Sequence, residues 1–84
     1  MLTTVRKRKR ELIAIEAKVR DWKKAVNQAF TRLFYVDESY IAIPHEHIPK
    51  VDRKILRTDG IGLISINSNA EIVIEPTKSR ITLD

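Results

Sequence analysis

Glu16 and Lys18 are the residues whose types and spacing best suit chemistry on a phosphate ester. They interrupt the end of an apolar segment, Leu12 to Val19, which reads Leu-Ile-Ala-Ile-Glu-Ala-Lys-Val. Residues two positions apart share one face of a strand and lie roughly 6.6 Å apart along it, so both side chains can reach one point beyond its carboxyl end. A carboxylate at that point can hold a hard divalent cation, and an ammonium group can orient the attacking water.

The spacing alone carries little information, because the sequence contains three acid-x-Lys matches. Those at Asp21 and Asp52 fall in segments that are predicted to be helical, whereas the match at Glu16 closes an apolar strand. The alternative interpretation of Glu16 and Lys18 is a strand-end ion pair whose charged heads reach solvent.

The segment that carries this pair predicts a strand in the middle of a sheet. Met1 to Val5 suits a first strand, and with the apolar segment it forms a strand pair at 1–19. Side chains alternate along a strand, and both faces of the second strand begin with apolar residues. Such a strand belongs in a sheet that helices cover.

A helix at 21–36 and a strand at 39–44 follow. Asp21 can cap the start of the helix. Tyr40 to Ile43 is apolar on both faces, and Pro44 stops this strand. A strand, a helix and a second buried strand form a βαβ crossover with parallel strands. Apolar residues recur with the period of an amphipathic helix at Trp22, Ala25, Val26, Ala29, Phe30 and Leu33.

The rest of the sequence predicts a short helix at 48–59 and a terminal hairpin at 61–75. Pro49 fits the first turn of this helix, and Gly60 is placed to end it. The segment 67–70, Asn-Ser-Asn-Ala, has turn chemistry between two alternating segments. The expected fold class is therefore α/β, a single domain over residues 1–84 that is built on a small mixed sheet with a βαβ crossover.

The segment Ile-Ala-Ile-Glu-Ala-Lys-Val-Arg-Asp-Trp-Lys-Lys-Ala-Val-Asn-Gln-Ala, from Ile13 to Ala29, precedes Asp-Glu-Ser-Tyr-Ile-Ala-Ile-Pro, which ends at Pro44. This combination resembles the PD-(D/E)XK superfamily of nucleases, also called restriction endonuclease-like. In that superfamily an apolar strand ends in Glu-x-Lys, the next helix carries a Gln near its middle, and a short buried strand follows. The similarity extends from Glu11 to Pro44.

The resemblance implies roles for four residues. Glu16 would be the metal-binding acid, Ala17 would offer its backbone carbonyl to the same metal, and Lys18 would be the catalytic lysine. Gln28 would be an accessory active-site residue, and a solvated helix flank is the alternative interpretation of its position. The implied cofactor is Mg²⁺ or Mn²⁺, and the implied enzyme is a Mg²⁺-dependent deoxyribonuclease that hydrolyses phosphodiester bonds.

The sequence departs from the superfamily pattern at its beginning. The pattern has a metal-binding Asp on the preceding strand and a helix before that strand, but no acid occurs between Met1 and Val5. Glu11 cannot replace the Asp, because it lies five residues from Glu16 and therefore on the opposite strand face. Three explanations stay open: an N-terminally truncated core, a partner chain that supplies the ligand, and a domain that has lost catalysis.

The net charge predicts nucleic acid, and DNA first, as the partner. The chain has 16 Lys plus Arg against 11 Asp plus Glu, a formal charge of +5. For the consecutive basic run, a solvated turn between strands is the alternative to phosphate binding. The residues expected to contact phosphates are Arg6, Lys7, Arg8, Lys9, Arg10, Lys23 and Lys24.

Composition narrows the possible sites and locations. The sequence has no cysteine, which excludes disulfides and thiolate zinc sites. No apolar run approaches the roughly 20 residues that span a bilayer, and the N-terminus lacks a secretion signal, so we expect a cytoplasmic protein without membrane contact. A core this small favours a homo-oligomer, and a dimer would be able to complete the site.

Two other groups are weaker candidates. His45 and His47 flank Glu46 as a His-x-His pair, which can ligate a metal on a strand but fits an exposed loop better. A base-stacking ring is the second candidate, although most of the rings fit the predicted cores: Trp22, Phe30, Phe34, Tyr35 and Tyr40.

Two functions from different classes follow from these observations. The first is a metal-dependent DNA endonuclease-like domain, in which Glu16 and the Ala17 carbonyl hold the metal and Lys18 assists the attacking water. The alternative is a non-catalytic nucleic-acid-binding or assembly module that keeps a relict nuclease fold and its basic surface.

Overall fold

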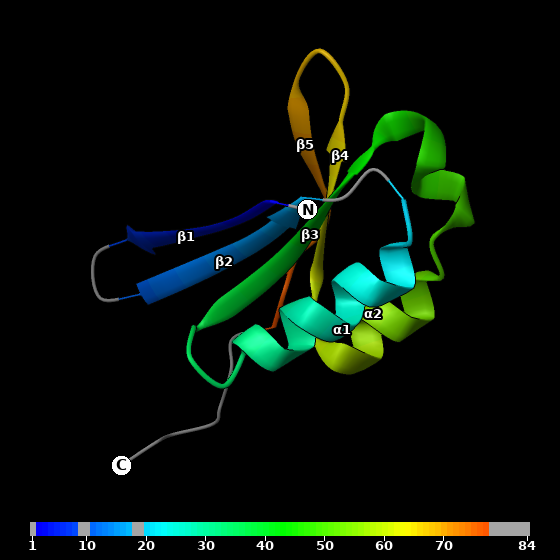
Figure 1. Ribbon diagram of the computed structural model, residues 1–84. Coiled ribbons are helices and arrows are strands. Elements are labelled where there is room, and N and C mark those ends of the chain that lie inside the picture. The colour runs from blue at the N-terminus through cyan, green and yellow to red at the C-terminus, as the bar shows by residue number, and fades with distance from the viewer. Residues whose placement is uncertain (1, 9–10, 18–19, 78–84) are drawn as a thin grey trace.

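The computed structural model of the protein describes residues 2–8, 11–17 and 20–77, and within them five strands form one mixed sheet (Figure 1). The strands lie side by side in chain order, β1-β2-β3-β4-β5. The two outer pairs are antiparallel and the two inner pairs are parallel. The expected α/β class, with a mixed sheet and βαβ crossovers, is thereby confirmed.

The first antiparallel pair consists of β1 (Leu2–Arg8) and β2 (Glu11–Ala17). It occupies the strand pair expected at 1–19, and β1 continues into the basic run. The register opposes Thr3 to Glu16 and Lys7 to Leu12. The basic residues of β1 therefore lie beside the start of β2, at the end of the hairpin away from Glu16.

The first crossover runs from β2 through α1 (Trp22–Arg32) to β3 (Glu38–Pro44). Asp21 caps α1, because its side chain accepts a hydrogen bond of 3.3 Å from the backbone N–H of Lys24. The helix ends at Arg32 rather than at 36, and the chain leaves it through turns that are closed by backbone hydrogen bonds to Phe30, Thr31 and Arg32.

The buried stripe of α1 is narrower than predicted. Ala25, Val26, Ala29 and Leu33 are buried, but the Phe30 side chain is 44% exposed. Small residues bring the helix close to the sheet, so the ring of Phe30 lies beside the contact instead of within it. The assignment of Phe30 to the core is therefore wrong.

The second crossover runs from β3 to β4 (Gly62–Ile66) through a 3-10 helix, η1 (His45–Lys50), and the short α2 (Arg53–Asp59). The prediction of one helix at 48–59 is therefore wrong in part. The extended backbone of Val51 ends η1. The Asp52 side chain then caps α2 by accepting a hydrogen bond from the backbone N–H of Lys54. Gly60 ends α2 in the left-handed region, at φ 74°, as its position predicts.

The hairpin predicted at 61–75 consists of β4 and β5 (Ala70–Ile74), which closes the sheet. Gly62 on β4 opposes Tyr40 on β3. A Cβ atom at this glycine would lie 2.5 Å from Tyr40 Cδ2. Glycine is therefore the residue that lets the tyrosine ring pack flat against the neighbouring strand.

The hydrophobic core lies on one face of the sheet. Both helices lie on that side (Figure 1), and their buried residues pack with Ile41, Ile43 and Leu63. Neighbouring strand residues such as Tyr40 and Ala42 point to the opposite face, which no helix of the described segments covers. The expectation of a sheet covered by helices thus holds for one face. None of the described helices has the length and apolar character to cross a bilayer.

Candidate active site and the adjacent pocket

Glu16 is buried under α1 near the carboxyl end of β2. Its side chain is 1% exposed. The register opposes it to Ile41, which belongs to the core, so its carboxylate lies on the face that the helices cover. Removing a carboxylate from water costs several kcal/mol unless polar groups compensate it. The structure must therefore supply partners to this group.

Arg32, in the last turn of α1, is one such partner. Its Nε donates a hydrogen bond of 3.2 Å to Glu16 Oε1, and its side chain is 46% exposed. The guanidinium therefore reaches solvent while the carboxylate does not. This arrangement differs from a strand-end ion pair with both heads in solvent, which the sequence left open as the alternative for Glu16.

Gln28 and Ser39 add further polar atoms to the layer between α1 and the sheet. Gln28 precedes Arg32 by about one helical turn and shares its flank of α1. Its Oε1 is buried and has no hydrogen-bond partner among the described residues. Ser39 opposes Ala14, on the same face as Glu16, and its buried Oγ is also without a partner within the described chain. The flank of α1 at Gln28 is thus partly enclosed rather than fully solvated.

Of the other two residues implied by the resemblance, only Ala17 is described. Ala17 ends β2, is half-buried and opposes Ala42 of β3. Lys18 lies outside the described residues, as do Lys9 and Arg10 of the basic run.

The polar atoms of this layer are oxygens, which suit a hard cation, but they are few. Mg²⁺ takes oxygen ligands, and Glu16, Gln28 and Ser39 each offer one or more. However, no three His, Asp or Glu side chains gather into a metal-binding group in the described segments. Arg32 also bonds one of the Glu16 oxygens. A cation bound here would have to draw further ligands from water, from substrate phosphate or from the parts of the chain outside this description.

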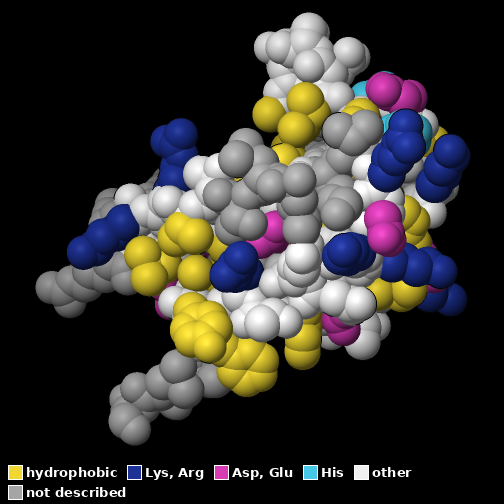
Figure 2. All heavy atoms as spheres, viewed as in Figure 1, with side chains coloured by type: hydrophobic (Ala, Val, Ile, Leu, Met, Phe, Trp, Pro, Cys, Tyr) yellow, Lys and Arg dark blue, Asp and Glu magenta, His cyan; other side chains and the backbone are white. Residues whose placement is uncertain are grey.

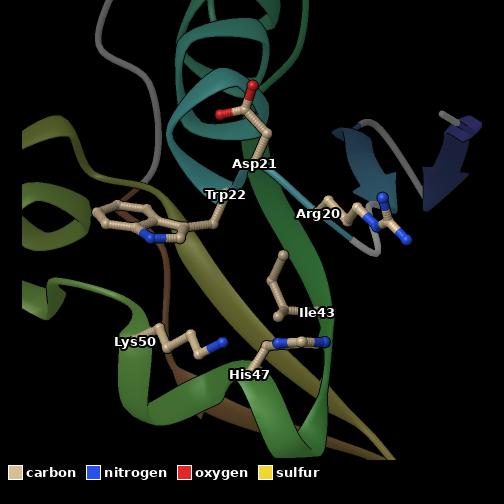
Figure 3. Close-up of a pocket in the computed structure, with 6 residues that line it drawn as sticks. All are labelled: Arg20, Asp21, Trp22, Ile43, His47 and Lys50. Atoms are coloured by element: carbon tan, nitrogen blue, oxygen red, sulfur yellow. The ribbon is translucent and has the colours of Figure 1, made fainter.

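A pocket of about 190 Å³ opens at the carboxyl ends of β2 and β3. In Figure 3 the Trp22 indole, the Lys50 ammonium and the His47 ring border the hollow, and Ile43 lies between them. The guanidinium of Arg20 and the carboxylate of Asp21 point away from it (Figure 3). Ligands of open α/β sheets bind at this end of the strands. The residues that line the pocket are Arg20, Asp21, Trp22, Ile43, His47 and Lys50.

The predicted phosphate-binding residues are divided between two regions. Arg6 and Lys7 are exposed on β1, whereas Lys23 and Lys24 are exposed at the start of α1. Figure 2 shows Lys and Arg side chains over the β1–β2 hairpin, over the helices and on the side of η1. From Leu12, opposite Lys7, to Glu16 the strand rises by about 13 Å. The basic residues of β1 are therefore not brought to the buried carboxylate.

The His-x-His segment has a different environment from the one expected. Its residues belong to η1, not to a loop. His45 is exposed, and its Nδ1 lies 3.0 Å from Ser65 Oγ on β4. His47 is half-buried and lines the pocket. The two rings thus lie in different surroundings.

Two residues of this region, Arg32 and Lys50, were not predicted from the sequence, and His47 was named only as a weaker metal-ligand candidate. Arg32 follows Gln28 by four positions, and this spacing was a signal for a shared flank. The acid that pairs with Arg32 is Glu16 on β2. Local periodicity cannot reveal a contact between a helix and a strand. Lys50 and His47 are brought to Trp22 by η1, and the sequence gives no clear signal for a 3-10 helix there.

Comparisons with protein-family models, with curated proteins and with solved structures find no match for this chain.

Proposed function

We propose that this chain is a restriction endonuclease-like domain that binds DNA and cleaves it with Mg²⁺ or Mn²⁺, in which Glu16 binds the metal and Lys18 assists the attacking water. The Ala17 carbonyl would be a second metal ligand and Gln28 an accessory residue. The proposed setting is a cytoplasmic homodimer.

The observation that carries the proposal is the burial of Glu16 at the carboxyl end of an inner parallel strand. An apolar residue at this position would pack with Ile41 at no desolvation cost, so an acid here is expensive for folding alone. Gln28 Oε1 and Ser39 Oγ are also buried and lack partners in the described chain, which is costly as well. Polar groups of this kind gather where a site, rather than a core, is built.

The chemistry that suits these groups is hydrolysis of a phosphodiester. A cation held by the Glu16 carboxylate would neutralise a phosphate, and water bound to that cation is readily deprotonated. To hold a cation, the Glu16 carboxylate would have to give up its hydrogen bond with Arg32 at least in part. Arg32 is half-exposed, so its guanidinium has room to turn toward solvent or toward a phosphate.

The Glu16–Arg32 bond also favours the second candidate, a non-catalytic nucleic-acid-binding or assembly module. An arginine that holds the acid permanently would fill the position of the metal with a guanidinium. The fold and basic surface would then remain without cleavage.

Cleavage assays distinguish the two candidates. Supercoiled plasmid and branched DNA are incubated with the protein and Mg²⁺ or Mn²⁺. We expect nicking that requires the metal and is lost in Glu16→Gln and Lys18→Ala. Lys54→Ala is the matched control, because Asp52 and Lys54 have the same acid-x-Lys spacing on an exposed helix.

DNA binding is measured in parallel without metal. Retained binding in Lys18→Ala together with lost cleavage supports the catalytic role. If purified wild-type protein binds DNA but does not nick any of the substrates with either metal, the catalytic proposal is wrong and the second candidate replaces it.

A further inference from the structure

We propose that the pocket between Trp22, Ile43, His47 and Lys50 binds one unstacked nucleotide of a nucleic-acid strand, with its base against the indole and its phosphate at Lys50 and His47. This inference deepens the proposed function, on which it rests, because it names the part of the substrate that is recognised beside Glu16.

The size of the pocket suits one small group. Its volume of about 190 Å³ is below the range of roughly 300 to 1,000 Å³ that is typical of sites for larger ligands. A single base with part of its sugar fits such a space, whereas a stacked pair of bases does not. The opening to solvent leaves a path for the rest of the strand.

The lining combines an apolar wall with cationic groups. Trp22 and Ile43 provide the apolar surface, and the Lys50 ammonium and His47 ring border the same hollow (Figure 3). Aromatic rings stack on bases without regard to sequence, and a nearby cation suits the phosphate. An apolar ligand alone would leave the ammonium without an anionic partner.

The charges around the pocket favour an anion. Lys50 lines it, and the Lys23 ammonium lies 5.9 Å from the Trp22 ring centroid, whereas the guanidinium of Arg20 points away from the hollow (Figure 3). The one acid of the lining, Asp21, points its carboxylate away and uses it to cap α1 (Figure 3). Among the described residues that line the pocket, no negative group therefore opposes a phosphate in the hollow.

The pocket lies near the backbone of β2 at Glu16, although Glu16 does not line it. Ile43 is two residues beyond Ile41 on the same face of β3, and Ile41 opposes Glu16 on the adjacent strand. Strand geometry then separates the Cα atoms of Ile43 and Glu16 by about 8 Å. A nucleotide held in the pocket would thus lie beside the strand that carries Glu16, although the carboxylate itself is buried and turned toward Arg32, at the other end of α1 from Trp22.

The fluorescence of Trp22 tests this inference, because the chain contains a single tryptophan. The full chain is titrated with a short oligothymidylate, with a blunt duplex hairpin of similar length and with inorganic phosphate. We expect saturable quenching by the single strand and little change with the duplex or with phosphate. Lys50→Gln should weaken the single-strand affinity about tenfold.

Lys54→Gln is the matched control, because it removes the same charge from an exposed residue that does not line the pocket. Its effect on affinity should be smaller than about twofold. Equal weakening by the two variants, equal quenching by duplex or phosphate, or no quenching by the single strand would overturn the inference. These titrations contain no metal, so their outcome is independent of whether cleavage occurs.

Discussion

The hydrogen bond between Arg32 and Glu16 stabilises the fold and also occupies the carboxylate that is proposed to bind the metal. The guanidinium compensates a carboxylate that is almost fully enclosed, and it does so from a half-exposed position. Glu16 has an additional interaction besides this bond. The arginine is therefore an important but not an exclusive partner, and its loss should weaken the fold without abolishing it.

Arg32→Ala is expected to lower the free energy of unfolding by about 1 to 2 kcal/mol, because a buried carboxylate loses a charged hydrogen-bond donor. For a domain of this size each kcal/mol shifts the Tm by about 4 to 8 °C. Thermal and urea unfolding measure the change.

The Glu16→Gln background provides the control for this prediction. There the carboxylate is absent, so Arg32→Ala should cost less than half of its effect in the wild type. Equal costs in both backgrounds would mean that Arg32 stabilises the protein through its aliphatic stem, and the assigned ion pair would then be energetically unimportant.

Local sequence predicts α1 and the strands, but not the break between η1 and α2. The period of the apolar residues predicts α1 and the alternation predicts the strands, because both patterns come from one repeating backbone geometry. The break between η1 and α2 was missed, because Val51 and Asp52 change the backbone path within an otherwise helical apolar pattern. Glu16 was identified because an acid interrupts an apolar strand.

The fit between β3 and β4 depends on a contact that local sequence cannot show. Gly62 and Tyr40 are distant in sequence, and only the register makes them neighbours. The ring of Tyr40 has little freedom to withdraw, since the residue is buried. The backbone oxygen of Ile74 lies 3.1 Å from the same Cβ position of residue 62 and crowds it from another side.

Gly62→Ala is therefore expected to destabilise the protein by about 1 to 3 kcal/mol through overpacking. Chemical denaturation of the variant measures this cost. In a Tyr40→Leu background, where the clashing ring atoms are absent, the additional cost of Gly62→Ala should fall. If the cost stays the same in both backgrounds, the ring does not cause the strain.

The whole molecule is elongated, with principal extents of 41 × 24 × 20 Å. The β1–β2 hairpin extends beyond the helices, which leaves apolar side chains uncovered where it meets the end of α1. Figure 2 shows them as one hydrophobic area on that side of the molecule. We define this apolar patch by four exposed residues, Val5, Leu12, Phe30 and Phe34.

We expect the apolar patch to mediate the predicted self-association into a dimer. Contiguous apolar areas of this kind are uncommon on monomers, and a stable dimer needs roughly 1,200 to 2,000 Å² of total buried surface. Phe34→Glu should therefore shift the mass in sedimentation equilibrium from twice 9.7 kDa toward 9.7 kDa.

Ile66→Glu is the matched control for this prediction, because it adds the same charge at an exposed apolar residue on β4, outside the patch. It should leave the dimer intact. A wild-type protein that is monomeric at high concentration would contradict the prediction, and so would equal dissociation by both variants.

The order of the strands in the sheet has a consequence for biosynthesis. Each strand pairs with the strand that precedes it in the chain, so no strand has to wait for a distant segment before it finds a neighbour. The two inner pairs are parallel, however, and each closes only after its crossover has formed, as the pairing of Ile13 with Glu38 illustrates; such non-local pairing is the slow part of folding. The sheet can still grow one strand at a time as the chain leaves the ribosome, with Glu16 already enclosed between its neighbouring strands when β3 has joined.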